Sequence, residues 1–168
     1  MTEQEKMIKF HEIIKDIKFT MMTTADEKGA LHSRPMACVS TKESQMAQND
    51  LWFFTKKSSG KVEAIEHDRH VNLAYSDPQH NRYVSVAGRA ELVEDQRKLE
   101  EFWNPIFKSW FPKGLEDPEI ALLKISVDSA EYWDSPSSKL VQLFGFVKAV
   151  TTGKAYEPGE KEHGRLHT

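Results

Sequence analysis

The sequence has little of several features that would assign it to a class of protein. Its 168 residues contain one cysteine, Cys38, so no disulfide can form within the chain. It has no apolar run of about 18 residues, the length that a membrane-spanning helix needs, and its N-terminus lacks the pattern of a secretory signal. The formal net charge of −3 gives no chain-wide basic surface for nucleic acid. We expect a cytoplasmic protein of one domain that binds neither a membrane nor nucleic acid.

Common catalytic motifs are also missing. No two glycines stand two apart, which excludes the dinucleotide fingerprint, and neither a Walker phosphate loop nor a G-x-S-x-G motif is present. Glu63, His67 and His70 have the spacing of half a metal site, with no further ligand cluster. His67 also fits the C-terminus of a helix, where cations are favoured. We favour this structural interpretation and expect no metal.

Strand signals dominate the chain. Alternating and β-branched residues predict strands over 19–24, 31–40, 51–55, 71–75, 82–93, 121–127 and 130–133. Gly88 lies inside one of them and indicates a bulge or bend. Apolar spacing predicts an N-terminal helix to about residue 17, opened by the capping box Thr2–Glu5, and helical segments over 61–67, 95–111 and 137–150. These elements favour a small, mostly antiparallel barrel with helical cover.

Two segments could bind a phosphate. The first, Thr55 to Lys61, joins a strand end to a helix start and offers three hydroxyls and three ammonium groups; ordinary capping explains it equally well. The second contains Arg34 in the middle of a strand, followed by Pro35, which indicates an edge or bulged position. An arginine there can hold a phosphate with two hydrogen bonds, beside irregular backbone that a flat heterocycle can approach.

Five stretches together resemble one family. They are Ser33-Arg34-Pro35-Met36, Leu51 to Thr55 followed by Ser59-Gly60-Lys61, Val84 to Ala90, Trp110 to Gly114 with Asp117-Pro118, and Ala130 to Asp134. Their order over residues 5–150 resembles the flavin-binding split barrels related to pyridoxamine 5′-phosphate oxidase, in the bacterial general stress protein branch. The resemblance implies a mainly β (α+β) fold, a six-stranded antiparallel split β-barrel with flanking helices. It also implies a homodimer that binds FMN in clefts at the subunit interface.

The resemblance also implies an FMN-binding split-barrel domain over residues 1–150 and a flexible polar C-terminal tail over 151–168. In that domain Arg34 and Lys61 would hold the FMN phosphate, helped by the hydroxyls of Thr55 and Ser59. The backbone of Pro35 and Met36 would run beside the flavin ring. The remaining cofactor-binding residues that we expect are Ser33 and Phe54 from the matching motifs, Trp110 near the cleft, and Trp133 from the partner subunit.

The sequence departs from the oxidase pattern at several positions. Gly60 replaces the arginine of a Ser-Arg-Lys phosphate clamp, and Tyr83 replaces a glutamine near the flavin ring. An Arg-Leu-His that grips the vitamin substrate is replaced by Lys139-Leu140-Val141. The later Arg165-Leu166-His167 falls in the expected tail, and we interpret it as chance. These departures argue against oxidation of pyridoxamine phosphate and leave flavin binding as the expectation.

Three functional hypotheses follow. The first is an FMN-binding general-stress-type protein that passes electrons between the flavin and a small-molecule donor or acceptor, with the chemistry supplied by the cofactor. The second is a module that holds or buffers flavin without turnover. The third is a pyridoxamine 5′-phosphate oxidase with an altered substrate site. No residue has a clear claim to be a catalytic acid or base, so the catalytic residues stay unassigned.

Overall fold

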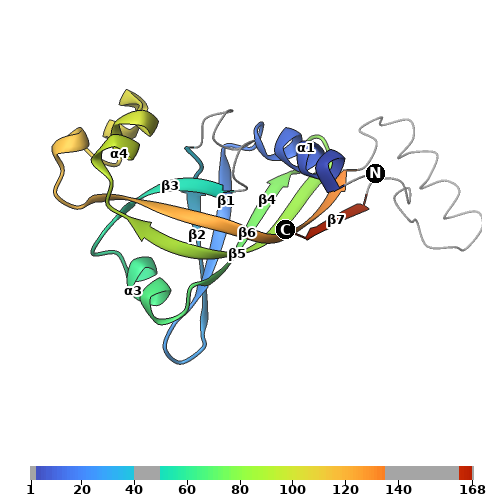
Figure 1. Cartoon of the computed structure of the whole chain (residues 1–168), viewed down its shortest axis with the longest axis horizontal. Coiled ribbons are helices and arrows are strands. Elements are labelled where there is room, and N and C mark those ends of the chain that lie inside the picture. Colours follow the sequence, from blue (N-terminus) through green and yellow to red (C-terminus); the bar gives the residue numbers. More distant parts are fainter. Residues whose placement is uncertain (1–2, 40–49, 135–162, 168) are drawn as a thin grey trace, which may run out of the picture.

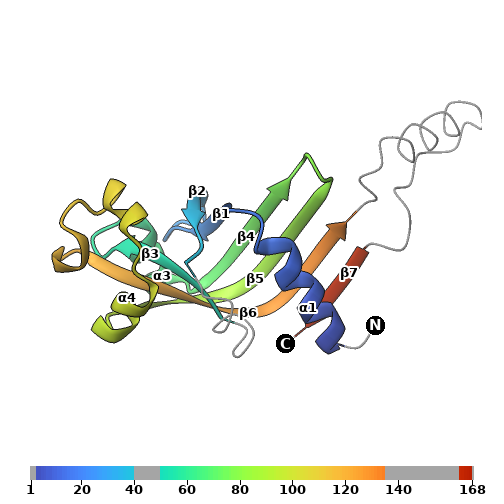
Figure 2. The same ribbon diagram turned by 90° about the horizontal axis from the view of Figure 1, so that it is seen from above.

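A computed structural model of the chain describes residues 3–39, 50–134 and 163–167. In this part of the chain, strands form one antiparallel sheet and helices lie at its ends and over its inner side (Figures 1 and 2). The strands are β1 (Phe19–Ala25), β2 (Leu31–Ala37), β3 (Asp50–Lys56), β4 (His70–Asp77), β5 (Arg82–Val93), β6 (Ile120–Asp134) and β7 (His163–His167). The helices are α1 (Glu3–Ile14), α3 (Gly60–His67), α4 (Gln96–Phe102) and the short 3₁₀ helices η1 (Pro105–Ser109) and η2 (Gly114–Glu116).

The sheet curls into a split barrel. Its strand order is β2-β1-β4-β5-β6-β3, and β7 pairs with the second half of β6 beyond the end of β3. The end of β2 returns to β3, where Cys38 bridges Phe53 and the Val39 amide donates to the Trp52 carbonyl at 2.8 Å. The predicted fold, a six-stranded antiparallel split barrel with flanking helices, is confirmed, with β7 as an additional strand.

Strand β6 is continuous where the sequence predicts two strands. The register against β5 shifts so that Ala87 pairs with Ser129 and Gly88 with Val127, which leaves Asp128 as the extra residue of a bulge. The predicted turn before Ala130 is therefore wrong. The predicted irregularity at Gly88 is confirmed by this register shift, and a Cβ at Gly88 would lie 2.6 Å from the Ser126 carbonyl oxygen.

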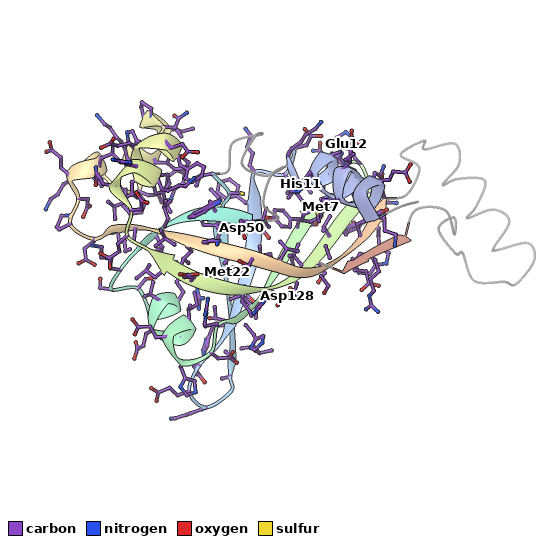
Figure 3. The ribbon with its side chains drawn as sticks, viewed as in Figure 1. Met7, His11, Glu12, Met22, Asp50 and Asp128 are labelled. Carbon is purple, nitrogen blue, oxygen red and sulfur yellow. The ribbon has the colours of Figure 1, made fainter. Side chains whose placement is uncertain are left out.

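Helix α1 covers the open end of the barrel. Phe10, Ile13 and Ile14 are at most 4% exposed and pack with the inward residues of the central strands, as their spacing predicts. Figure 3 labels Met7 and His11 on the same helix, far from the end where α4 lies. A second apolar cluster lies at that far end, where α4 and the 3₁₀ helices pack on β3 and the start of β6.

Two predicted segments differ in detail. The helical segment 95–111 divides into α4, capped by the Asp95 carboxylate, and η1, because Pro105 has no N–H to continue the first helix. Residues 163–167 belong to the predicted flexible tail, yet they pair with β6 as strand β7. Thr2 of the predicted capping box and the predicted helix 137–150 lie outside the described residues. Within the described residues, no helix combines the length and apolarity needed to cross a membrane.

Candidate functional site

Arg34 lies on edge strand β2, next to Pro35. The edge position explains why a proline is tolerated in this strand, because its missing N–H faces no second neighbour strand. The Arg34 side chain is half-buried and its Nη1 donates a hydrogen bond to the Thr24 hydroxyl of β1 at 2.9 Å. Thr24 is buried, so this contact fixes the guanidinium on the inner side of the hairpin.

The start of α3 faces the same place. Ser59 is the N-cap residue, but its side chain makes no capping hydrogen bond; its hydroxyl lies 3.4 Å from the Thr55 hydroxyl at the end of β3. Lys61 follows in the first turn of the helix and is half-buried. The strand end and the helix start therefore present two hydroxyls and an ammonium group on one side.

Two further cations lie close enough to Lys61 to repel its charge. Burial lowers the pKa of the Lys61 ammonium, and the positive charges of Arg34 and Lys56 lower it further. Burial also lowers the pKa of the Arg34 guanidinium. Among the described residues no carboxylate forms an ion pair with any of these three side chains, which we call the cation cluster (Arg34, Lys56 and Lys61). Unpaired cations that share a partly buried site suit an anion.

A cavity of about 320 Å³ adjoins the cation cluster. Lys56 and Lys61 line one part of it, and aromatic side chains from β3 and the η1 region form walls. The Phe54 ring packs 4.9 Å from that of Phe107, centroid to centroid. The lining residues are Phe19, Pro35, Met36, Ala37, Phe54, Thr55, Lys56, Lys61, Phe107, Trp110 and Phe111. A cavity with cations and aromatic walls suits a flat ring that carries a phosphate.

The structure brings most of the predicted site residues together. Pro35, Met36, Phe54, Thr55, Lys61 and Trp110 line this cavity; Ser59 lies beside Thr55, and Arg34 lies near enough to Lys61 to depress its pKa. Ser33 does not line the cavity; its hydroxyl lies 2.6 Å from that of Thr23 on the neighbouring strand β1. Lys56 belongs to the phosphate-binding segment that the sequence predicted, but it was not among the expected cofactor-binding residues. The lining residues that sequence reasoning missed are Phe19, Ala37, Phe107 and Phe111. For Phe107 and Phe111 the aromatic spacing of 102–111 was the available signal.

Trp133 does not line the cavity of its own chain. It pairs with Tyr83 across β5 and β6, on the outer face of the sheet, and is 40% exposed. Phe19 and Met21 of β1 are also exposed, at 52% and 42%. Between them lie small side chains such as Ala74 and Ser85, which face each other across β4 and β5. We call this surface the outer face (Phe19, Met21, Tyr83 and Trp133 with the small residues between them).

His70, one of the residues with metal-ligand spacing, is held by a neighbouring carboxylate. Nδ1 of His70 lies 2.8 Å from the Asp68 carboxylate, which also accepts the His70 backbone N–H. In the described ranges, no three His, Cys, Asp or Glu side chains form a group that could hold a metal ion.

The sequence matches a known family over most of its length. A profile of the family described as pyridoxamine 5′-phosphate oxidase like matches residues 5–157. Among individual proteins, the chain is 32% identical to protein bli-3 of Neurospora crassa over 146 residues, which cover 82% of this chain and 68% of that protein. It is 25% identical to general stress protein 26 of Bacillus subtilis over 148 residues, covering 85% of this chain and 99% of that protein.

Solved structures show the same architecture. The crystal structure of a general stress FMN/FAD binding protein from Xanthomonas citri superposes with a TM-score of 0.66 at 29% identity, covering 78% of this chain and 89% of that one. The family profile spans residues 5–157 and therefore includes the strands and the start of α3 that carry the cation cluster.

Proposed function

This chain belongs to the pyridoxamine 5′-phosphate oxidase like family, in its general stress protein branch, and on that premise we propose that it binds FMN and uses it to pass electrons between small molecules. The observation that carries the proposal is the cation cluster without carboxylates beside an aromatic-walled cavity. A terminal phosphate monoester fits such a cluster, because two charges of the dianion can be shared among an arginine fork and two ammonium groups.

Each residue has a distinct part in the proposed site. Arg34, held by Thr24, and Lys61 bind the phosphate, with the Thr55 and Ser59 hydroxyls as further donors. Pro35 and Met36 lie beside the ring, and Phe54 and Trp110 line the cavity that holds it. A bound flavin supplies one- or two-electron transfer, and the protein supplies position and electrostatics. We assign no residue of the chain as a proton donor or acceptor.

The proposal includes a homodimer. Aromatic side chains with 38–52% exposure border small residues on the outer face, and an exposed apolar surface of this kind is typical of an interface. A partner placed there would bring its Trp133 toward the ring end of the site. Sedimentation at low micromolar concentration should give twice the 19.3 kDa chain mass. Replacement of Met21 by Lys should shift it to a monomer; a monomeric wild-type protein would contradict this part of the proposal.

A flavin titration tests the cofactor. Quenching of flavin fluorescence should saturate at one FMN per chain, whereas riboflavin, which lacks the phosphate, should bind far more weakly because the cation cluster has nothing to hold. FAD is the third ligand, since the Xanthomonas citri relative is described as binding FMN or FAD. If FMN and riboflavin bind equally well, the cation cluster is not the phosphate site.

Reduction tests the electron transfer. We expect NADH or NADPH to bleach the flavin under nitrogen and air to restore it. Stable yellow colour without bleaching would favour the module that only holds flavin. Formation of pyridoxal phosphate from pyridoxamine phosphate would instead favour an oxidase with an altered substrate site.

A single cysteine is consistent with the reducing cytoplasm, which we propose as the location; fractionation of cells followed by immunoblotting tests it.

A further inference from the structure

Lys56 is the member of the cation cluster that ends a strand. It is the last residue of β3 and lines the proposed flavin cavity together with Phe54, Thr55 and Lys61. Its backbone carbonyl accepts a hydrogen bond from the Ser59 N–H at 3.1 Å, which closes a tight turn between β3 and α3. Lys56 lies close enough to Lys61 for its positive charge to lower the pKa of the Lys61 ammonium.

Lys57, the next residue, has different surroundings. Its ammonium lies 2.7 Å from the Glu94 carboxylate, its backbone N–H donates to the Glu119 carbonyl at 2.9 Å, and it does not line the cavity. Lys56 is exposed, lines the cavity and forms no ion pair with a carboxylate in the described part of the chain. Of two adjacent lysines, one is thus paired within the fold, and the charge of the other is available to a ligand.

The positive charge at this strand end is not offset. Burial, then Arg34, then Lys56 lower the pKa of Lys61, and no carboxylate of the described residues is among the groups that shift it. Because the Coulomb energy is proportional to the charge of each partner, such a site distinguishes ligands by how much negative charge they carry. A terminal phosphate monoester, with a second pKa of about 6, carries about two negative charges at pH 8. A phosphate diester carries one, because the second ester bond removes the second ionisation.

We propose that Lys56 is a specificity-determining residue, which makes the site prefer a flavin with a terminal phosphate monoester over one with a phosphate diester. Arg34 and Lys61 bind the phosphate oxygens, and the Lys56 ammonium attracts the second negative charge that only the monoester carries. FMN is such a monoester, whereas each phosphate of FAD keeps a single negative charge. The inference rests on the proposed function for the presence of a flavin, and it assigns the choice between FMN and FAD to one side chain.

Fluorescence titrations of flavin-free protein at pH 8 and low ionic strength test the proposal, with FMN, its monomethyl phosphate ester, FAD and riboflavin as ligands. Lys56→Met should weaken FMN about ten-fold and the two diesters about three-fold, because the lost Coulomb energy follows the ligand charge. Riboflavin should be unaffected. The preference for FMN over its methyl ester should therefore fall about three-fold, and added salt should reduce the difference.

Two variants serve as controls. Lys57→Met removes the same charge one residue away, outside the cavity, and should leave the preference for FMN over its methyl ester unchanged. Lys56→Arg keeps the charge and should keep the preference. An unchanged preference in Lys56→Met, an equal loss in Lys57→Met, or a loss in Lys56→Arg as large as in Lys56→Met would each overturn the inference while FMN binding stands.

Inorganic phosphate separates the inference from the proposed function. In flavin-free protein, followed by NMR of labelled lysine side chains, phosphate should bind more weakly to Lys56→Met than to Lys57→Met. Equal phosphate binding by the two variants would count against Lys56 as an anion-binding residue and overturn the inference. Phosphate binding that depends on Lys56, in a protein that takes up no flavin, would keep Lys56 in that part and remove the proposed function instead.

Discussion

Arg34 and Arg82 are both half-buried arginines on strands of the same sheet, but their surroundings differ. Arg82 donates two hydrogen bonds to the Asp77 carboxylate, at 2.6 and 3.2 Å, and reaches Asp16 at 3.5 Å. Hydrogen bonding to Asp77 raises the pKa of Arg82. The single hydrogen bond given by Arg34 within the described residues goes to the Thr24 hydroxyl, and burial lowers its pKa.

The difference separates a structural arginine from a functional one. Arg82 ties the last residue of β4, Asp77, to Asp16 in the segment between α1 and β1, and its charge is neutralised inside the fold. Arg34 is placed among other cations, which the folded chain tolerates at a cost in free energy. Side chains that bind ligands often carry a charge that no other group of the protein neutralises. Five predictions test and extend this contrast.

The largest expected effect is on FMN affinity in Arg34→Ala. Loss of hydrogen bonds to a charged phosphate should weaken FMN binding by about 1.5–3 kcal/mol. Arg82→Ala is the control and should keep the wild-type affinity, because Arg82 belongs to the Asp77 network and does not line the proposed flavin cavity. Fluorescence titration of both variants measures the difference. Equal affinities in the two variants would remove Arg34 from the proposed phosphate site.

Sequence reasoning could find Arg34 and Lys61 because their residue types, neighbours and order carry the family resemblance. It could not find Thr24 as the residue that holds Arg34, since this contact depends on the β1–β2 register, in which Arg34 pairs with Met22. The alternation of apolar residues predicted β5 with the bounds Arg82–Val93 that the structure has. That pattern is local, and the Thr24 contact is not.

Strand β7 and the continuity of β6 show the same limit. His163–His167 has weak strand character by itself, and it becomes a strand because the second half of β6 has an edge that β3 does not occupy. Asp128 next to Ser129 is typical of a turn, but the β5 partner strand absorbs the extra residue as a bulge, with Arg89 donating to the Asp128 carboxylate at 2.8 Å. In both cases the deciding interaction comes from a partner strand.

The next largest effect is on thermal stability, which Arg82→Ala should lower and Arg34→Ala should not. Arg82→Ala leaves Asp77 without its arginine, so the midpoint of thermal unfolding should fall by roughly 2–4 °C, a typical shift for a domain of this length. Arg34→Ala should leave the flavin-free protein at least as stable, because it relieves repulsion in the cation cluster. Scanning calorimetry of flavin-free protein compares them, and a larger fall in Arg34→Ala would reverse the assignment.

The acid limb of the stability curve gives a sharper version of this test. Hydrogen bonding by Arg82, then by His80, lowers the pKa of Asp77 from 3.8 to about 2. A carboxyl with a lowered folded-state pKa stabilises the fold above its unfolded pKa and loses that contribution as the pH falls through the folded one. The difference in stability between wild type and Arg82→Ala should therefore shrink from pH 4 to pH 2. A difference independent of pH in this range would contradict the ion pair.

A smaller effect is expected on the titration of Lys61. Burial comes first among the causes that lower its pKa, with Arg34 second, so Arg34→Ala should raise the pKa of Lys61 only part of the way to 10.5. Inorganic phosphate should raise it in the wild type, because an anion favours the ammonium form. NMR of the labelled lysine side chains follows both.

The smallest effect is expected for Gly60→Ala, which changes the backbone beside the cation cluster and leaves its charges unchanged. Gly60 precedes Lys61, its φ lies outside the left-handed region, and a Cβ there would meet no atom within 4 Å. Gly60→Ala should therefore stabilise the protein by about 0.4–1 kcal/mol through the unfolded state and leave FMN affinity unchanged. Gly88→Ala is the contrasting control, because its Cβ would lie 2.6 Å from the Ser126 carbonyl oxygen and must destabilise the sheet. Weaker FMN binding in Gly60→Ala would mean that the ligand approaches the backbone at the start of α3, so that the cluster binds through amides as well as through Arg34 and Lys61.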